Sequence, residues 1–493
     1  MRLPGLRPRS PGIGKVRAHV YLRLHALLCC SLVLWILLPR ACAQSIAASE
    51  KTPPAPYTPQ VWDIDWSYLR EAHNREDWTD CLHYIPLGKS PRHFLSITGQ
   101  VRERGEYQDH PAFGAQPANN GYLLQRYLLS ADLEAGEHFR TFVQLDSGLI
   151  HGRDGGPRPE IDEDKLDFNQ AFLDVTPWRA GEDASFTVRA GRQLVSLGST
   201  RLIATGAGLN VEQPFDGFRL TLHAAGWTAN GLALRPTLIE SGAFDNQPNA
   251  MEELWGLYLT HPMSRLRRAH FDLYYLGFDH KTARYTQGSG REQRETLGAR
   301  LWSQTPSWDY DFEYTGQFGR FNRGDIRAWG AGYHLGYVYS AKRFAPHPEI
   351  DGGVLSGDKN PHDHTLGTFH PLFPNGNYLS ESILLGPYNL VITRPTFKLS
   401  LTRKASSNTN EEFLWRQSKQ DGVYNIAGIL IHPANGSTAS YIGSQFQEVI
   451  DYNFSRHLSG ALAYEHFFSG AFLKQSPPGR SLNFLSPQLT WNF

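Results

Sequence analysis

The sequence predicts an all-β protein, a transmembrane antiparallel β-barrel of about 16–18 strands with long extracellular loops. Three observations support this prediction: a secretory leader, recurring segments in which apolar and polar side chains alternate, and an amphipathic final segment that ends on Phe493. Strands of this kind can close into a barrel whose apolar face meets lipid. We therefore expect the protein in the outer membrane of a Gram-negative bacterium.

Residues 1–43 have the three parts of a signal peptide. Six basic residues and no acidic residue precede or begin the apolar run at 24–38, and a small-x-small cleavage site follows at 41–43. A retained anchor is the alternative, but the apolar run is shorter than a membrane-spanning helix needs. Cleavage would leave Cys81 as the last of the four cysteines, so we expect no intrachain disulfide in the mature chain.

The composition excludes several classes of protein. With 493 residues, 40% of them hydrophobic, and a mean hydropathy of −0.42, the chain cannot form a bundle of apolar membrane helices. The 48 basic residues balance the 48 acidic ones, but cleavage removes seven basic residues, leaving 41 and a net charge of −7. No nucleic acid is expected as a partner. Gly, Pro and aromatic residues are spread along the chain, which indicates one large β body.

The region before the barrel is expected to be a periplasmic lead-in. Residues 44–57 are rich in Pro, Ala and Ser, which favours disorder, and 61–80 is the one nearby segment with a helical pattern. The predicted organisation is therefore a signal peptide at 1–43, an N-terminal lead-in at 44–93 and the barrel at 94–493.

From residue 94 onward the chain alternates between strand-like segments and turns. Apolar and polar residues alternate within each segment, and Gly, Pro, Asn or Asp separates one segment from the next. No helical period recurs, which argues against βαβ units. The predicted strands include 94–107, 122–134, 139–146, 168–175, 185–193, 217–224, 252–260, 269–278, 296–303, 308–319, 328–339, 395–402, 449–454 and 460–468.

Two interruptions are too long for ordinary turns, and we expect them to gate the channel or bind a ligand. Residues 151–167 are glycine-rich and then acidic, so they form either a solvated charge run or a site for Ca²⁺ or lipopolysaccharide. Residues 344–386 hold two Asp and two His between positions 358 and 364, which are either polar surface or metal ligands.

The last nine residues, LSPQLTWNF, form an amphipathic strand. Apolar residues at 485, 487, 489, 491 and 493 share one face, and polar residues at 486, 488, 490 and 492 share the other. A half-buried strand of a soluble sandwich would show the same pattern. The terminal Phe493 favours the barrel, because it resembles the aromatic end of the last strand in outer-membrane barrels.

Charge collects on the face opposite the apolar one. Within 95–106 the even positions carry Arg102, Arg104 and Glu106, whereas the odd positions 95–101 are apolar or Gly. The same sorting recurs around Asp132 and Asp174. In a soluble sandwich this polar face would meet bulk water, but in a barrel it lines an aqueous lumen.

Short motifs in four regions of the chain, taken in order, resemble the alginate-export family of outer-membrane proteins. They are VRAGRQ at 188–193 followed by DGFRL at 216–220, LSGDKNPHDHTLGTFHPLFP at 355–374, YEHFFSGAFL at 464–473, and the terminal LTWNF. The resemblance implies an eighteen-stranded barrel with an arginine-rich constriction for an anionic polysaccharide. It makes Arg189 and Arg192 pore candidates, although their opposite parity requires a bulge near Gly191 if both face the lumen. The spacing of Glu448 and Asp451 departs from the family pattern and puts one of them off the lumen face.

We predict an outer-membrane channel that passes or exports an anionic solute, a polysaccharide of the alginate type, through an arginine-lined pore. A general or small-solute porin is the alternative, and a secreted β-rich carbohydrate-active enzyme or lectin is more distant. Several of the predicted residues could instead pair with carboxylates simply to satisfy charge. The predicted pore-lining residues are Arg102, Arg104, Arg126, Asp132, Asp174, Arg189, Arg192 and Arg219.

No catalytic residue, metal ligand or cofactor is predicted. The sequence contains no GxSxG, HExxH, P-loop or CxxC motif, and its scattered carboxylates form no defensible acid–base pair. A Ser/His site assembled in space would escape this test. The expected partners are an anionic polysaccharide or small anionic solute, outer-membrane lipid and lipopolysaccharide, together with periplasmic export proteins.

Overall fold

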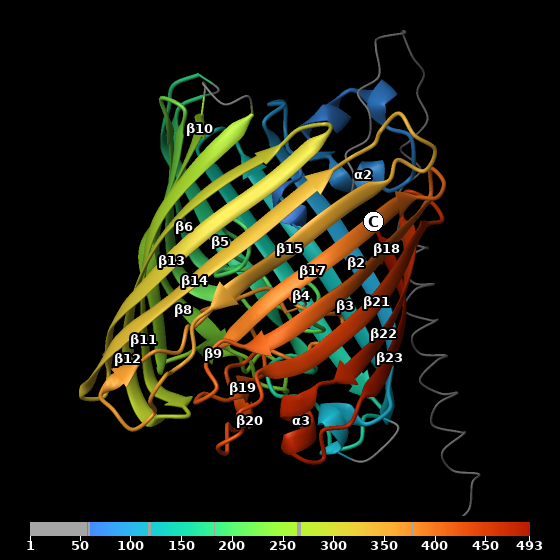
Figure 1. Ribbon diagram of the computed structural model, residues 1–493. Helices are drawn as coiled ribbons and strands as arrows, with labels where there is room; N and C mark the ends of the chain where they lie inside the picture. The colour runs from blue at the N-terminus through green and yellow to red at the C-terminus, as the bar shows by residue number, and fades with distance from the viewer. Residues whose placement is uncertain (1–56, 58–59, 117–119, 182, 264–267, 377) are drawn as a thin grey trace, which may run out of the picture.

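The structure, a computed structural model, is a closed β-barrel (Figure 1). Within the described residues, 18 antiparallel strands form the wall, and the first pairs with the last to close it. The prediction of a barrel with about 16–18 strands is confirmed. The structure describes residues 57, 60–116, 120–181, 183–263, 268–376 and 378–493, so the predicted signal peptide and residues 44–56 lie outside it.

The strands of the wall follow one another in chain order. They are β2 (His93–Gln108), β3 (Asn120–Ala135), β4 (Phe139–His151), β5 (Asp164–Arg179), β6 (Ser185–Gln193), β7 (Phe215–Ala224), β8 (Trp227–Leu238), β10 (Glu252–Met263), β11 (Ala269–Tyr285), β12 (Gly288–Gln304), β13 (Trp308–Phe321), β14 (Gly324–Tyr337), β15 (His347–Leu355), β17 (Leu390–Ser400), β18 (Ala405–Arg416), β21 (Tyr441–Asn453), β22 (Leu458–Ser469) and β23 (Leu482–Asn492).

The remaining elements are short. The additional strands are β1 (Ile85–Pro86), β9 (Gln247–Pro248), β16 (Thr365–Leu366), β19 (Val423–Tyr424) and β20 (Leu430–His432). The helices are η1 (Val61–Asp63), η2 (Ser67–Arg70), η3 (Ala72–Asn74), η4 (Pro111–Gly114), α2 (Asp80–His83) and α3 (Ala471–Gln475). Among the described residues, no helix is long and apolar enough to cross a membrane.

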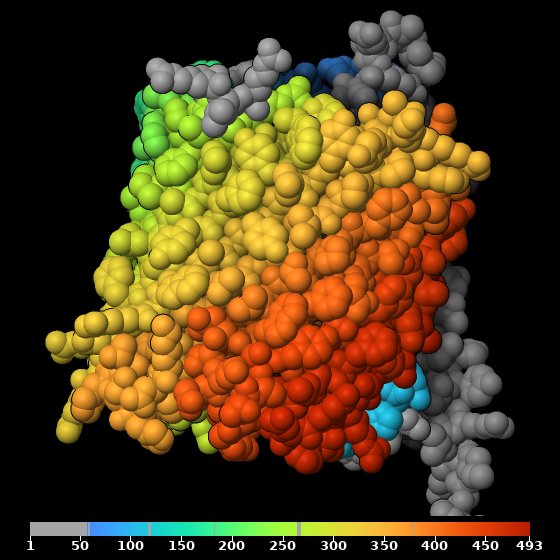
Figure 2. Space-filling view, in the orientation of Figure 1, coloured from blue at the N-terminus to red at the C-terminus, as the bar shows by residue number. Residues whose placement is uncertain are grey.

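Alternation along each strand sorts the side chains between the outside and the lumen. On β3, Leu129 and Leu133 are exposed on the outer face, whereas Ser130 and Asp132 point inward and are buried. Figure 2 shows one side of the outer wall, where the side chains of β13 to β22 cover the surface. Exposed apolar residues on these strands include Phe312, Tyr314, Trp329, Leu335, Ile350, Phe397, Ile450, Leu462 and Phe468.

The two ends of the barrel differ in the length of their connections. Short turns such as 136–138, 225–226 and 401–404 lie at the end that carries the N-terminal segment, at the top of Figure 1. Long connections, including 194–214 and 356–389, lie at the other end. Outer-membrane barrels have short periplasmic turns and longer extracellular loops, so we refer to these as the periplasmic and extracellular ends.

The terminal Phe493 sits where the barrel closes. Its backbone N–H donates to the carbonyl of Gly99 at 2.9 Å, and the N–H of Gly99 donates back to its carbonyl at 2.7 Å. The aromatic ring covers Gly99, where a Cβ atom would lie only 2.3 Å from the ring. The glycine in β2 therefore makes the space for the last side chain of the chain.

Three strands of the wall, β8, β15 and β18, were not among the predicted segments. The strand β15 even falls inside the predicted loop 344–386, because its Pro and Gly-Gly pattern is typical of a turn. The two glycines serve packing instead: a Cβ on Gly352 would lie 2.5 Å from the Tyr333 hydroxyl, and one on Gly353 would lie 2.6 Å from a β14 carbonyl. The helical expectation for 61–80 was also too strong, since that segment forms three short 3₁₀ turns.

The prediction that no intrachain disulfide forms concerns the mature chain, in which Cys81 is the last cysteine. Cys81 is disulfide-bonded in the structure of the full-length chain. The full chain retains the cysteines that the predicted cleavage would remove. The prediction for the mature chain depends on that cleavage.

Candidate functional site

Two long extracellular connections, 194–214 and 356–389, fold into the barrel and pack against each other. The N–H of Ala204 donates to the carbonyl of Phe373 at 2.8 Å, and the N–H of Phe373 donates to the carbonyl of Leu202 at 2.8 Å. Apolar residues of both segments share one buried cluster with lumen-facing residues of the wall such as Tyr274 and Phe278. We call the two segments the inner loops.

Three predicted pore residues hold the first inner loop. The Arg102 and Arg126 guanidinium groups donate to the carbonyl of Ala207 at 3.1 and 3.2 Å, and both also bond to the carbonyl of Leu209. Arg104 donates to the carbonyl of Gly208 at 3.3 Å. All three arginine side chains are buried. They face the lumen, but their donors are used to anchor a loop.

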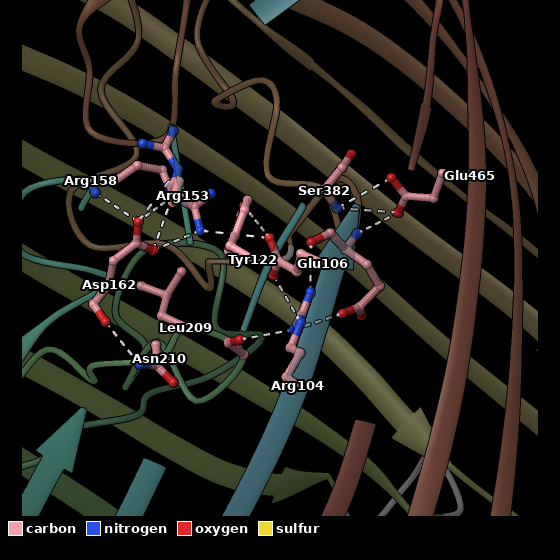
Figure 3. Close-up of polar contacts among 12 residues, drawn as sticks. Arg104, Glu106, Tyr122, Arg153, Arg158, Asp162, Leu209, Asn210, Ser382 and Glu465 are labelled. Atoms are coloured by element: carbon pink, nitrogen blue, oxygen red, sulfur yellow. Dashed lines mark hydrogen bonds and ion pairs between the residues drawn. The ribbon is translucent and has the colours of Figure 1, made fainter. Parts of the chain in front are cut away.

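The same region ties several extracellular connections together (Figure 3). Arg104 pairs with Glu106 at 2.9 Å, and Arg158 of connection 152–163 lies 3.9 Å from the other oxygen of that carboxylate. Arg158 also pairs with Asp162, whose carbonyl accepts a hydrogen bond from Asn210 at 2.8 Å. This network fixes the inner loop 194–214 to the connection 152–163.

The second inner loop has its own anchors on the wall. Glu465 of β22 accepts hydrogen bonds from the backbone N–H groups of Glu381, at 2.7 Å, and Ser382, at 3.2 Å. Figure 3 shows the Glu465 carboxylate directed at Ser382. On the opposite part of the wall, Arg294 donates to the carbonyl of Thr368 at 3.2 Å.

A second group of predicted residues lies nearer the periplasmic end. Asp174 receives two hydrogen bonds from Arg189, at 2.7 and 2.8 Å. Asp132 receives two in the same way from Arg140, at 2.9 and 2.7 Å. Arg219 of β7 lies directly opposite Arg189 of β6 in the strand register. The Arg219 guanidinium donates its hydrogen bonds to the side-chain oxygen of Asn230 and not to a carboxylate.

A cavity of about 490 Å³ opens beside these side chains. The Arg189 and Arg219 side chains line it from the wall, and Trp62 and Asp63 line it from the N-terminal segment. Among the described residues, no carboxylate oxygen pairs with Arg219 within 4.0 Å, unlike the Arg189–Asp174 pair. Arg219 is therefore a half-buried cation that faces a space large enough for a small solute.

Arg192 does not share the lumen face with Arg189. It lies opposite Ala171 of β5 and Asp216 of β7, on the parity of the exposed Leu173 and Phe218. Its guanidinium pairs with Asp216 at 2.9 Å and Asp167 at 3.2 Å. The backbone has positive φ at Gly191, but the pairing register continues through it without a shift.

Glu448 likewise points outward. It lies opposite Thr409 and accepts a hydrogen bond from Ser407 at 2.6 Å. The spacing of Glu448 and Asp451, which differs from the family pattern, therefore puts Glu448 off the lumen face. That face carries Gln445 and Gln447, both of which are buried.

Several lumen arginines were missed. On β12, Arg294 and Arg300 share the parity of Thr296, so alternation in the predicted strand 296–303 could have identified Arg300. Strand alternation could not have identified Arg201, because it lies in an inner loop. Its guanidinium reaches across the lumen to Asp311 and Glu313 of β13, at 2.8 Å from each carboxylate.

The loop residues considered as metal ligands are not brought together. Asp162, Asp164 and Asp167 are buried and bonded to protein groups, so the acidic run is not simply solvated. Burial raises the pKa of Asp358 to about 6. The residues at 362–364 are exposed, and neither group of clustered metal-ligating side chains among the described residues includes them.

A histidine–carboxylate cluster lies on the lumen side of β13 to β15. The Asp309 carboxylate contacts His334 at 2.7 Å and His347 at 3.0 Å, and the other ring nitrogens face Asp351 at 2.8 Å and Glu349 at 3.0 Å. The Lys398 ammonium lies 2.8 Å from Glu349. Each imidazole thus bridges two carboxylates, and we assign no metal to the cluster.

The family of this chain follows from its similarity to known proteins. A sequence profile described as alginate export matches residues 93–485, which is most of the chain. The chain belongs to the alginate-export family. No curated protein sequence matches it. The resemblance predicted from short motifs is confirmed.

Solved structures share the fold of this alginate-export protein. OccK11 (OpdR) of Pseudomonas aeruginosa is 13% identical, with a TM-score of 0.52, over 81% of this chain and 96% of that one. A BenF-like porin from Pseudomonas fluorescens Pf-5 is 10% identical, with a TM-score of 0.56, over 81% and 98%. OccK2 (OpdF) of P. aeruginosa, solved in complex with glucuronate, is 10% identical, with a TM-score of 0.53, over 81% and 98%.

The family and the barrel together define the class of protein. The chain is a channel of the Gram-negative outer membrane, as predicted. The family is described as alginate export, and one structural neighbour is named a porin. The secreted enzyme or lectin considered as a distant alternative does not fit an outer-membrane barrel of this family.

Proposed function

We propose that this channel passes an anionic solute carrying sugar carboxylates, a polysaccharide of the alginate type, and that Arg189 and Arg219 select for it. The observation that carries the proposal is the cavity of about 490 Å³, into which these two adjacent guanidinium groups project. Only Arg189 has a carboxylate partner on the wall. A solute carboxylate is a suitable counterion for Arg219.

Selectivity of this kind depends on local charge and not on the net charge of the chain. Charges beyond a Debye length of about 8 Å are screened at physiological salt, whereas lining charges in a narrow passage act directly on the solute. A guanidinium stays ionised and offers a carboxylate two parallel donors. Neighbouring arginines can pass a carboxylate from one to the next.

The predicted pore residues then take two roles in our proposal. Arg189 and Arg219, with Asp174, line the transport path. Arg102, Arg104 and Arg126 shape the path by anchoring the inner loop 194–214, and Asp132 fixes Arg140. Arg192, on the opposite face of β6, is assigned to the outer wall near the extracellular end.

A porin for small anionic solutes is the second candidate. It is favoured by the small volume of the lumen cavities and by the glucuronate complex of OccK2, a barrel of the same fold. A single sugar acid and a polyuronate present the same carboxylate to Arg219. Permeation of glucuronate alone, measured as a reversal potential in a glucuronate gradient, without permeation of alginate oligomers would favour the small-solute porin.

The experiment is the reversal potential of the purified channel in a KCl gradient. We expect wild type to prefer chloride and the Arg189→Gln/Arg219→Gln variant to lose most of that preference. Arg192→Gln is the matched control, because it removes a charge three residues away on the other face. A cation-selective wild type, or an unchanged double variant, would contradict the proposal.

A further inference from the structure

The N-terminal segment 60–92 enters the periplasmic end of the barrel. The side chain of Trp62 is 5% exposed and packs against the stacked rings of Phe142 and Phe172, two residues on the lumen face of β4 and β5. Leu194, at the start of an inner loop, completes this apolar site. The segment therefore reaches from the periplasmic mouth to the loops that enter from the other side.

Asp63, next to Trp62, lies in the same cavity as the selective arginines. Asp63 is exposed in the open cavity, where partial desolvation raises the pKa of its carboxyl and the nearby positive charges of Arg189, Arg219 and Arg140 oppose that effect. Arg140 also donates a hydrogen bond to the carbonyl of Trp62. The segment thus presents a carboxylate and a carbonyl to the arginines that a solute carboxylate would meet.

The rest of the segment is fixed to the rim. Asp80 pairs with Arg456 at 3.1 Å, and Asp77 bonds to His457, both in the periplasmic turn between β21 and β22. The strand β1 pairs with the start of β2, and Ser96 donates to the carbonyl of His83 at 2.7 Å. The Trp66 ring stacks on His83, with 4.0 Å between the ring centroids.

The two parts of the segment are held differently. Residues 77–92 have ion pairs, strand pairing and hydrogen bonds to the wall. Trp66 belongs with them, because it is buried in an apolar cluster with Leu69, Tyr84 and Phe94. Residues 61–63 are held by the apolar site of Trp62 and by the hydrogen bond from Arg140 to the Trp62 carbonyl, which a competing anion can take over. With this arrangement, residues 61–63, the tip of the segment, can leave the lumen while the rest of the segment stays attached to the wall.

We propose that residues 61–63 are a displaceable periplasmic plug, in which Trp62 closes the lumen and Asp63 occupies the place of a solute carboxylate at Arg189 and Arg219. The plug lowers the flow of ions when no solute is present. A sugar acid entering from the periplasm competes with Asp63 for the arginines and releases the tip. This inference deepens the proposed function, because it treats the same cavity as the transport path.

The first test uses planar-bilayer conductance in KCl. Trp62→Ala/Asp63→Asn removes the apolar anchor and the carboxylate, and we expect the conductance or the open probability to rise several-fold. Trp78→Ala is the matched control, because Trp78 is a tryptophan of the same segment whose side chain is 54% exposed. Heat-modifiable migration on a gel verifies that each variant forms a folded barrel.

The second test locks the plug reversibly. Gln60 and Thr221 line the same cavity from the segment and from β7. In a Cys81→Ser background, Gln60→Cys and Thr221→Cys are joined by a short thiol-reactive cross-linker that a reductant cleaves. We expect the cross-linked channel to open less often and to recover when the reductant is added.

The results separate this inference from the proposed function. Equal conductance before and after cleavage of the cross-link, together with a double variant that conducts like wild type, would overturn the plug. Chloride selectivity would still stand in that case, since the reversal potential measures it independently. Release by the sugar acid is tested with glucuronate, which should increase opening of wild type and leave the Trp62→Ala/Asp63→Asn channel unchanged.

Discussion

The anchoring of the inner loop 194–214 gives the sharpest quantitative prediction. Arg102 and Arg126 each donate to the carbonyls of Ala207 and Leu209, and both side chains are buried. The Arg102→Gln/Arg126→Gln variant removes these contacts but keeps polar side chains. We expect the loop to leave the lumen far more often and the channel to show larger conductance levels.

The size of the effect follows from the contacts. A hydrogen bond to a charged group contributes about 1.5–3 kcal/mol, and the two bonds of one guanidinium are not additive. We assign about 2 kcal/mol to each arginine and about 3–4 kcal/mol to both. Since about 1.4 kcal/mol is a factor of ten, the population of the released loop should rise roughly 100- to 700-fold.

Single-channel recording measures this population as the fraction of time at each conductance level. Arg323→Gln is the control, because Arg323 is exposed in the turn between β13 and β14 at the same end of the barrel. Conductance levels and dwell times that match wild type in the double variant would refute the assignment of these arginines as loop anchors.

Three further predictions concern the second inner loop, the closing seam and the periplasmic rim. Glu465→Ala leaves the N–H groups of Glu381 and Ser382 without their acceptor, at a cost of about 1–3 kcal/mol for each buried donor, and should increase proteolysis of loop 356–389, whereas Glu448→Ala on the outer face should not. Gly99→Val overpacks the Phe493 ring and should lower the unfolding temperature on heat-modifiability gels by an amount equivalent to about 1–3 kcal/mol, whereas Gly316→Val, which has no atom within 4 Å of its Cβ position, should have a smaller effect. Burial would raise the pKa of Asp77, but hydrogen bonds from Thr79 and His457 outweigh it and lower the pKa from 3.8 to about 2, so the docking that Asp77 contributes is present above about pH 4 and lost as the pH falls toward 2. Hydrogen exchange of residues 67–92, measured between pH 5 and 2, should show this loss of docking, and Asp77→Asn should remove the pH dependence. Amide protection in wild type that stays constant over this pH range would contradict the predicted loss of docking at low pH.

The sequence by itself determined the class of fold and the sorting of side chains between lipid and lumen. Alternation is a local property of each strand, so Arg102, Arg104 and Arg189 could be assigned to the polar face without knowing their neighbours. The same logic warned that Arg189 and Arg192 have opposite parity, and the strand register keeps them on opposite faces. The final strand and Phe493 were identified for the same reason.

Only the tertiary structure decided what those lumen side chains do. Arg102 and Arg126 bind backbone carbonyls about a hundred residues away, and a carbonyl acceptor leaves no mark in the identity of its side chain. The glycines of β15 looked like a turn because the tight approach of Tyr333 and of the β14 backbone is a property of neighbouring strands. The N-terminal segment was predicted only as a periplasmic lead-in, because the apolar site for Trp62 forms only when β4, β5 and an inner loop meet. Strand alternation is set by covalent geometry within a few residues, whereas loop insertion is set by contacts that exist only after the barrel has closed.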